Sequence, residues 1–91
     1  MIAVFSTDRG WRQPLEAALR EHRYEVRSAS RPAELAKCLG DGRVQLVIAG
    51  PLAGEGDAAQ RTAGGCPVIC TSPADTPERI VHRAEAVLGA L

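Results

Sequence analysis

Hydroxyl and carboxyl side chains follow two of the apolar stretches of this chain, and a glycine follows a third. The side chains are those of Ser6, Thr7, Asp8, Thr71 and Ser72, and the glycine is Gly50. If the three stretches are parallel strands, Ser6, Thr7, Gly50, Thr71 and Ser72 line a crevice at one edge of a sheet, where small ligands or phosphates bind in open α/β folds. Asp8 alone is a poor site for a divalent cation, because such ions are normally held by several oxygen ligands.

The glycine-rich stretch Gly50 to Gly56 follows a predicted strand and precedes a predicted helix, the position at which phosphate cradles occur. It lacks the Gly-x-x-x-x-Gly-Lys-Ser/Thr pattern, and the acidic side chains of Glu55 and Asp57 would repel a phosphate. We therefore favour the interpretation as a plain connecting loop. The stretch from Ser6 to Gly10 holds one glycine only, so it is no dinucleotide-binding fingerprint.

The cysteines and histidines do not form a reactive set. Cys66 and Cys70 are four residues apart in a strand-like stretch, which separates them by roughly 13 Å at 3.3 Å per residue, too far for one metal ion. We expect Cys70 to be a buried structural thiol, since a nucleophile needs a nearby base or helix terminus. His22 and His82 occur singly and are interpreted as helix-flank residues. No catalytic residue, metal or cofactor is therefore expected.

The elements that would position these residues alternate between strand and helix. Predicted strands span residues 2–5, 24–29, 44–49 and 67–71, and predicted helices span 11–22, 31–39, 58–62 and 77–91, with Ser30, Asp57 and Thr76 as caps. Pro14 is expected in the first turn of its helix, where a missing N–H costs little. Strict alternation with short loops predicts a parallel sheet with right-handed crossovers.

Composition disfavours several classes of function. Eleven basic and eleven acidic residues cancel, whereas nucleic-acid binders normally carry a basic surplus, although six arginines crowd the first third of the chain. Nothing approaches the ~20 apolar residues that span a bilayer. With no targeting signal and three cysteines without a secretory context, we expect reduced thiols and a cytoplasmic location. Ninety-one residues predict one domain, spanning 1–91.

Along its whole length the pattern resembles the first four βα units of receiver domains from bacterial response regulators. The best match is Pro-Val-Ile-Cys-Thr-Ser at 67–72, which is similar to the family's fourth strand and places Ser72, or otherwise Thr71, at the switch position. The family's first strand ends in two or three magnesium-binding acidic residues, whereas here only Asp8 is acidic. Its third strand ends in the aspartate that accepts phosphate, whereas here Gly50 lies at that point.

The resemblance implies an α/β fold, namely a three-layer α/β/α sandwich. Its four-stranded parallel sheet would have the order 2-1-3-4, flavodoxin-like and receiver-like, without the family's fifth strand. It further implies a pseudo-receiver, because phosphoryl transfer to a carboxylate needs both that carboxylate and a divalent ion. The first hypothesis is therefore a non-enzymatic signalling or regulatory module that binds a protein partner. The alternative is a small-ligand or phosphate-binding domain, or a minor enzyme, that uses the crevice.

The degenerate site of this pseudo-receiver would comprise Asp8, Gly50, Thr71 and Ser72. The expected partner surface lies beside it and comprises Arg9, Trp11 and Arg12. Two interpretations of Trp11 stay open, a partner anchor and a cap over the helix and strand ends. A protein partner is expected, with no membrane association and with nucleic acid disfavoured.

Two further expectations concern the end of the chain. The apolar stripe of the last helix should pack beside the first helix, where a receiver's final helix would lie; its members are Ile80, Val81, Ala84, Val87, Leu88 and Leu91. The strand at 67–71 should be an uncharged sheet edge, which favours a homodimer through that strand or the last helix. The alternative is a monomer whose loops shield the edge.

Overall fold

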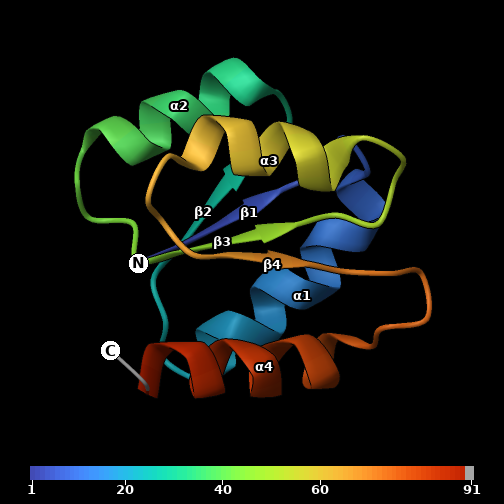
Figure 1. Ribbon diagram of the computed structural model, residues 1–91. Coiled ribbons are helices and arrows are strands. Elements are labelled where there is room, and N and C mark those ends of the chain that lie inside the picture. The colour runs from blue at the N-terminus through green and yellow to red at the C-terminus, as the bar shows by residue number, and fades with distance from the viewer. Residues whose placement is uncertain (90–91) are drawn as a thin grey trace.

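Strands and helices alternate along the chain in the computed structural model, which describes residues 1–89 (Figure 1). The strands are β1 (Ile2–Phe5), β2 (Val26–Ala29), β3 (Leu46–Ala49) and β4 (Val68–Cys70). The helices are α1 (Arg9–Glu21), α2 (Pro32–Gly40), α3 (Glu55–Ala63) and α4 (Pro77–Gly89). All strand pairs are parallel and the order is β2-β1-β3-β4, which confirms the predicted topology.

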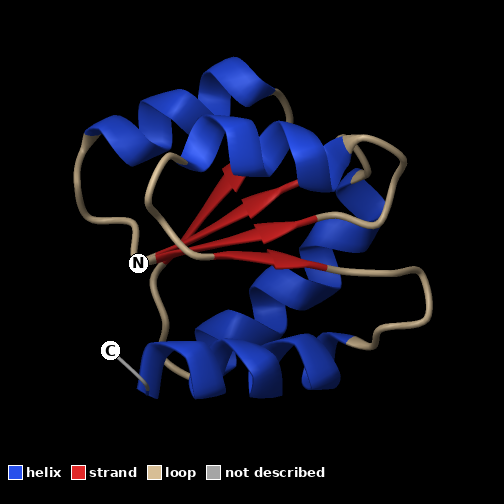
Figure 2. Ribbon diagram, viewed as in Figure 1, coloured by secondary structure: helices blue, strands red, loops and turns tan. Residues whose placement is uncertain are grey.

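Helices cover both faces of the sheet, so the fold has three layers (Figure 2). Successive side chains of a strand point to opposite faces. In β1, Ile2 and Val4 therefore join one core with α1 and α4, whereas Ala3 and Phe5 join a second core with α2 and α3. All four are buried, which explains why β1 is a continuous apolar run rather than an alternating one.

Helix α4 packs beside α1, as the sequence predicted. Ile80, Val81 and Ala84 of α4 are buried in the same core cluster as Leu15 and Leu19 of α1. The remaining members of the stripe are Val87 and Leu88, which pack partly buried against this cluster, and Leu91, which lies outside the described residues. The last helix thus covers the part of the sheet face that α1 leaves open.

Helix α1 begins two residues earlier than predicted, at Arg9. The Asp8 side chain accepts a hydrogen bond of 3.2 Å from the backbone N–H of Trp11 and so caps the helix. Pro14 consequently lies inside the helix, in its second turn rather than its first. The prediction of a first-turn proline was wrong because the apolar spacing does not reveal a polar first turn.

The N-cap residue of α2 is Arg31, whereas the sequence predicted Ser30. The Ser30 hydroxyl instead donates a hydrogen bond of 2.6 Å to the Glu34 carboxylate. This hydrogen bond is the main reason why the pKa of Glu34 lies below its ordinary value. The Ser30 hydroxyl thus bonds another side chain instead of a backbone N–H of α2, and Pro32 provides the helix start.

Helix α3 begins at Glu55, two residues before the predicted cap Asp57. Gly54 precedes it with a φ of 84°, a left-handed conformation that glycine adopts without strain. Glu55 therefore lies in the first turn of a helix, whereas the sequence predicted that it lies in a loop. The helix thus begins three residues before its predicted start at residue 58, which places the Glu55 side chain at the edge of the sheet where β1 and β3 end.

The prediction for Cys70 was wrong, because its side chain is exposed and the buried thiol is that of Cys38. Cys70 ends an edge strand, where Gln60 of α3 donates to its sulfur at 3.5 Å. Burial raises the pKa of the Cys66 thiol, which favours the protonated and less nucleophilic form.

Candidate functional site

The candidate site lies where the carboxyl ends of β1 and β3 meet, the edge at which the predicted crevice would open (Figure 1). Phe5 and Ala49 are paired in register as the last residues of these strands. The backbone N–H of Gly50 donates to the carbonyl of Phe5 at 2.8 Å, so the pairing continues past the strand. Ser6 and Gly50 consequently lie side by side.

The carboxylate of Glu55 fills this edge and is 5% exposed. The Ser6 hydroxyl donates to its two oxygens at 2.9 and 3.1 Å. Thr7 donates to Oε2 with its backbone N–H at 2.7 Å and its hydroxyl at 3.1 Å, and the backbone N–H of Leu52 donates to Oε1 at 3.2 Å. Burying a charge is costly unless it is well hydrogen-bonded. Neutral donors alone meet that need, since no ion pair within residues 1–89 involves Glu55.

Gly50 leaves the room that this carboxylate occupies. A Cβ added to Gly50 would lie 2.4 Å from Oε1 of Glu55 and 2.5 Å from Oγ of Ser6. Within a single aspartate, standard bond lengths put a carboxylate oxygen about 2.4 Å from its own Cβ. The Glu55 oxygen therefore lies at the distance from residue 50 at which an aspartate would place its own carboxylate.

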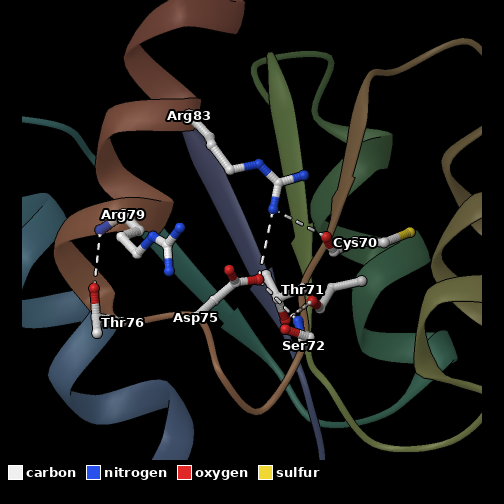
Figure 3. Close-up of polar contacts among 8 residues, drawn as sticks. Cys70, Thr71, Ser72, Asp75, Thr76, Arg79 and Arg83 are labelled. Atoms are coloured by element: carbon white, nitrogen blue, oxygen red, sulfur yellow. Dashed lines mark hydrogen bonds and ion pairs between the residues drawn. The ribbon is translucent and has the colours of Figure 1, made fainter.

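Three residues of the predicted site are engaged elsewhere. Asp8 caps α1, and the Thr71 hydroxyl donates to the carbonyl of Ala49 at 2.8 Å. Ser72 is exposed, and its backbone N–H donates to the Asp75 carboxylate at 2.9 Å (Figure 3). Within the described part of the chain, none of the three side chains hydrogen-bonds the buried carboxylate. The buried carboxylate is thus held by Ser6 and Thr7 after β1 and by Leu52 after β3, whereas the side chains that follow β4 take no part.

Arg83 of α4 reaches the free edge of β4 (Figure 3). Its Nη1 donates to the carbonyl of Cys70 at 3.3 Å and lies 3.6 Å from the Asp75 carboxylate. The strand itself is uncharged, as the sequence indicated, but a guanidinium from another element covers part of it. Because charges on an edge discourage pairing with a further strand, this contact partly protects β4.

The predicted partner surface lies at the first turns of α1. Arg9 is exposed, while Trp11 and Arg12 are half-buried. Trp11 is partly buried and packs against the core cluster shared by α1 and α4. The Nε atom of Arg12 is buried and has no hydrogen-bond partner among residues 1–89.

Glu55 is the site residue that sequence analysis missed. It was interpreted as a loop residue whose charge would repel a phosphate. A signal was present, because an acidic residue favours the first turn of a helix and the hydroxyls of Ser6 and Thr7 are good carboxylate donors. The approach of α3 to the end of β1 joins residues 49 positions apart, however, and no local pattern encodes it.

Within residues 1–89, no group of three or more His, Cys, Asp and Glu side chains is placed to hold a metal ion. No helix in the same range is both long and apolar enough to cross a membrane.

Comparison with known proteins supports the fold. No protein-family model matches the chain, and no curated protein matches it. Among solved structures it is similar to the chemotaxis protein CheY4 of Vibrio cholerae, crystallised at pH 4.0, with a TM-score of 0.68 and 12% sequence identity. The match covers 94% of this chain and 96% of that one. At this identity the likeness shows the fold, which is the flavodoxin-like receiver fold predicted from the sequence.

Proposed function

We propose that this chain is a non-enzymatic signalling or regulatory module that binds a protein partner and is not switched by phosphorylation. The observation that carries the proposal is the position of the Glu55 carboxylate beside Gly50. Phosphoryl transfer needs an accessible acceptor carboxylate and a divalent ion to neutralise the transferred group. Gly50 has no side chain to accept it, and the Glu55 carboxylate is buried with both oxygens hydrogen-bonded.

The same carboxylate holds the loop between β3 and α3 in one arrangement. Leu52 donates its backbone N–H to Oε1 of Glu55, and its carbonyl accepts the backbone N–H of Glu55 at 3.1 Å. A switch requires two arrangements whose balance a signal can change. Because both backbone polar groups of Leu52 are hydrogen-bonded to Glu55, we expect the loop to keep one conformation. Its surface, which includes the 46% exposed residue Leu52, would then be offered to a partner in one fixed arrangement.

The alternative hypothesis of a ligand-binding crevice receives less support. The donors of Ser6 and Thr7 that would hold a small ligand are already directed at Glu55. A second copy of the chain remains a proposed partner through the edge of β4 or through α4, where Arg83 leaves part of the strand uncovered.

Incubation with acetyl phosphate and Mg²⁺, followed by intact-mass measurement, tests the proposal. A receiver domain with its acceptor aspartate serves as the positive control for the reagent. We expect no mass change in this protein under conditions that label the control. A stable gain of one phosphoryl group on Asp8, Glu55 or any other carboxylate would refute the pseudo-receiver interpretation.

A further inference from the structure

We propose that the donors around Glu55 form a carboxylate-binding site that the chain occupies with its own side chain and that accepts a small external carboxylate when this side chain is removed. The site comprises the Ser6 hydroxyl, the hydroxyl and backbone N–H of Thr7, and the backbone N–H of Leu52. The inference concerns the ligand class of these donors, and it holds whether or not the module binds a protein.

The donors that directly follow β1 are positioned independently of Glu55. Ser6 is fully buried, and its backbone N–H donates to the carbonyl of Ala29 on β2 at 3.0 Å. Its Oγ also accepts the backbone N–H of Asp8 at 3.0 Å, which leaves the hydroxyl proton to be donated toward the carboxylate. The strand pairing therefore keeps these donors in place when the Glu55 side chain is absent.

The arrangement of donors fits a planar group with two oxygens. Ser6 donates to both oxygens, Leu52 to one, and Thr7 twice to the other. The two further oxygens of a tetrahedral phosphate would have no donor among these five hydrogen bonds, which are shared by two oxygens. No ion pair among residues 1–89 brings a cation to Glu55, so a doubly charged phosphate would be poorly compensated.

The atoms that the Glu55→Ala substitution removes indicate which external carboxylate should fit the site best. Alanine keeps Cβ, so the deletion removes one methylene and the carboxylate, which together have the size and shape of acetate. Formate lacks the methyl group and propionate has one carbon too many. Thr7 is exposed at the rim of the site, which gives a small anion a route from solvent.

Thermal unfolding of Glu55→Ala in acetate and in chloride, at matched pH and ionic strength, tests this inference. A ligand that binds only the folded state raises the midpoint in a saturable manner. We expect acetate to raise the midpoint of the variant by roughly 4 °C or more, formate and propionate to act more weakly, and the wild type not to respond. The matched control is Asp57→Ala, which removes an exposed carboxylate from the same helix and should not respond.

A second variant links the response to the site. Ser6→Ala combined with Glu55→Ala should lose the response to acetate, because the donor shared by both oxygens is gone. If Glu55→Ala is unfolded in chloride, its circular dichroism should recover in acetate. Absence of any acetate effect beyond that of chloride would overturn the proposal. Equal stabilisation of the wild type, or stronger stabilisation of the variant by inorganic phosphate, would overturn it as well.

Discussion

The side chains of Ser6 and Glu55 share the space that any side chain at residue 50 would need. Oγ and Cβ of Ser6 lie 2.5 and 2.6 Å from the position of an added Cβ, and Oε1 of Glu55 lies at 2.4 Å. Glycine at this position and glutamate at the start of α3 are therefore complementary. The carboxylate beside β3 comes from a neighbouring helix instead of from the strand itself.

Replacing Gly50 with alanine tests this complementarity at a single residue. The added methyl group would displace the buried carboxylate and press on Ser6, so we expect a loss of about 1–3 kcal/mol in the free energy of unfolding, as overpacked sites show. Chemical denaturation measures it. Gly40→Ala is the matched control, because no atom lies within 4 Å of its added Cβ, and it should be neutral or slightly stabilising. Equal stability of the two variants would contradict the described packing.

The sequence predicted one half of this arrangement and not the other. Gly50 could be placed at the carboxyl end of β3, because it follows a strand whose apolar run is unmistakable. Glu55 could not, because its role depends on where α3 begins and on the contact of that turn with the end of β1. Long-range contacts of this kind follow from the packing of the elements, which short patterns do not specify.

At the scale of elements, α4 follows β4 in the chain and packs beside α1. Its apolar stripe could be predicted from helical spacing, and its position from the handedness of the crossovers. The start of α1 was predicted two residues late and that of α3 three residues late. Asp8 and Gly54 decide those starts through a side-chain cap and a left-handed backbone, and neither contributes to the apolar pattern.

Substitutions in α4 test its packing on the sheet. Val87→Asp puts a carboxylate in the partly buried contact with the shared core cluster, and we expect a loss of about 2 kcal/mol in the free energy of unfolding. The neighbouring Ala86 is exposed, so Ala86→Asp should change stability by no more than about 0.5 kcal/mol. If both variants unfold at the same denaturant concentration as the wild type, α4 does not pack as described.

At the scale of the whole molecule, the sheet formed by residues 1–89 has four strands, which leaves β4 as one of its edges. The opposite edge, β2, carries Arg27, which forms an ion pair with Asp41 at 3.1 Å. On β4, the guanidinium of Arg83 covers the carbonyl of Cys70. The balance between monomer and dimer therefore depends on how well one guanidinium shields a short strand.

Sedimentation of the wild type and of Arg83→Ala at tens of micromolar tests this dependence. We expect self-association through the β4 edge, and we expect the variant to associate more tightly because its Cys70 carbonyl is free to pair. Arg79→Ala removes an exposed arginine one turn earlier on the same helix and should behave like the wild type. A species of 9.6 kDa at every concentration of all three proteins would rule the dimer out.

We propose that Glu55 closes the acceptor position and leaves this receiver-type fold in one state. The most direct test is a titration of the isotopically labelled protein with beryllofluoride, a phosphoryl mimic, and Mg²⁺, followed through the backbone amide resonances of Thr7, Gly50 and Leu52. These amides lie around the carboxylate, so binding at the site would move them. We expect all three resonances to stay unchanged throughout the titration. Saturable shifts at these amides would show an open acceptor site and contradict it.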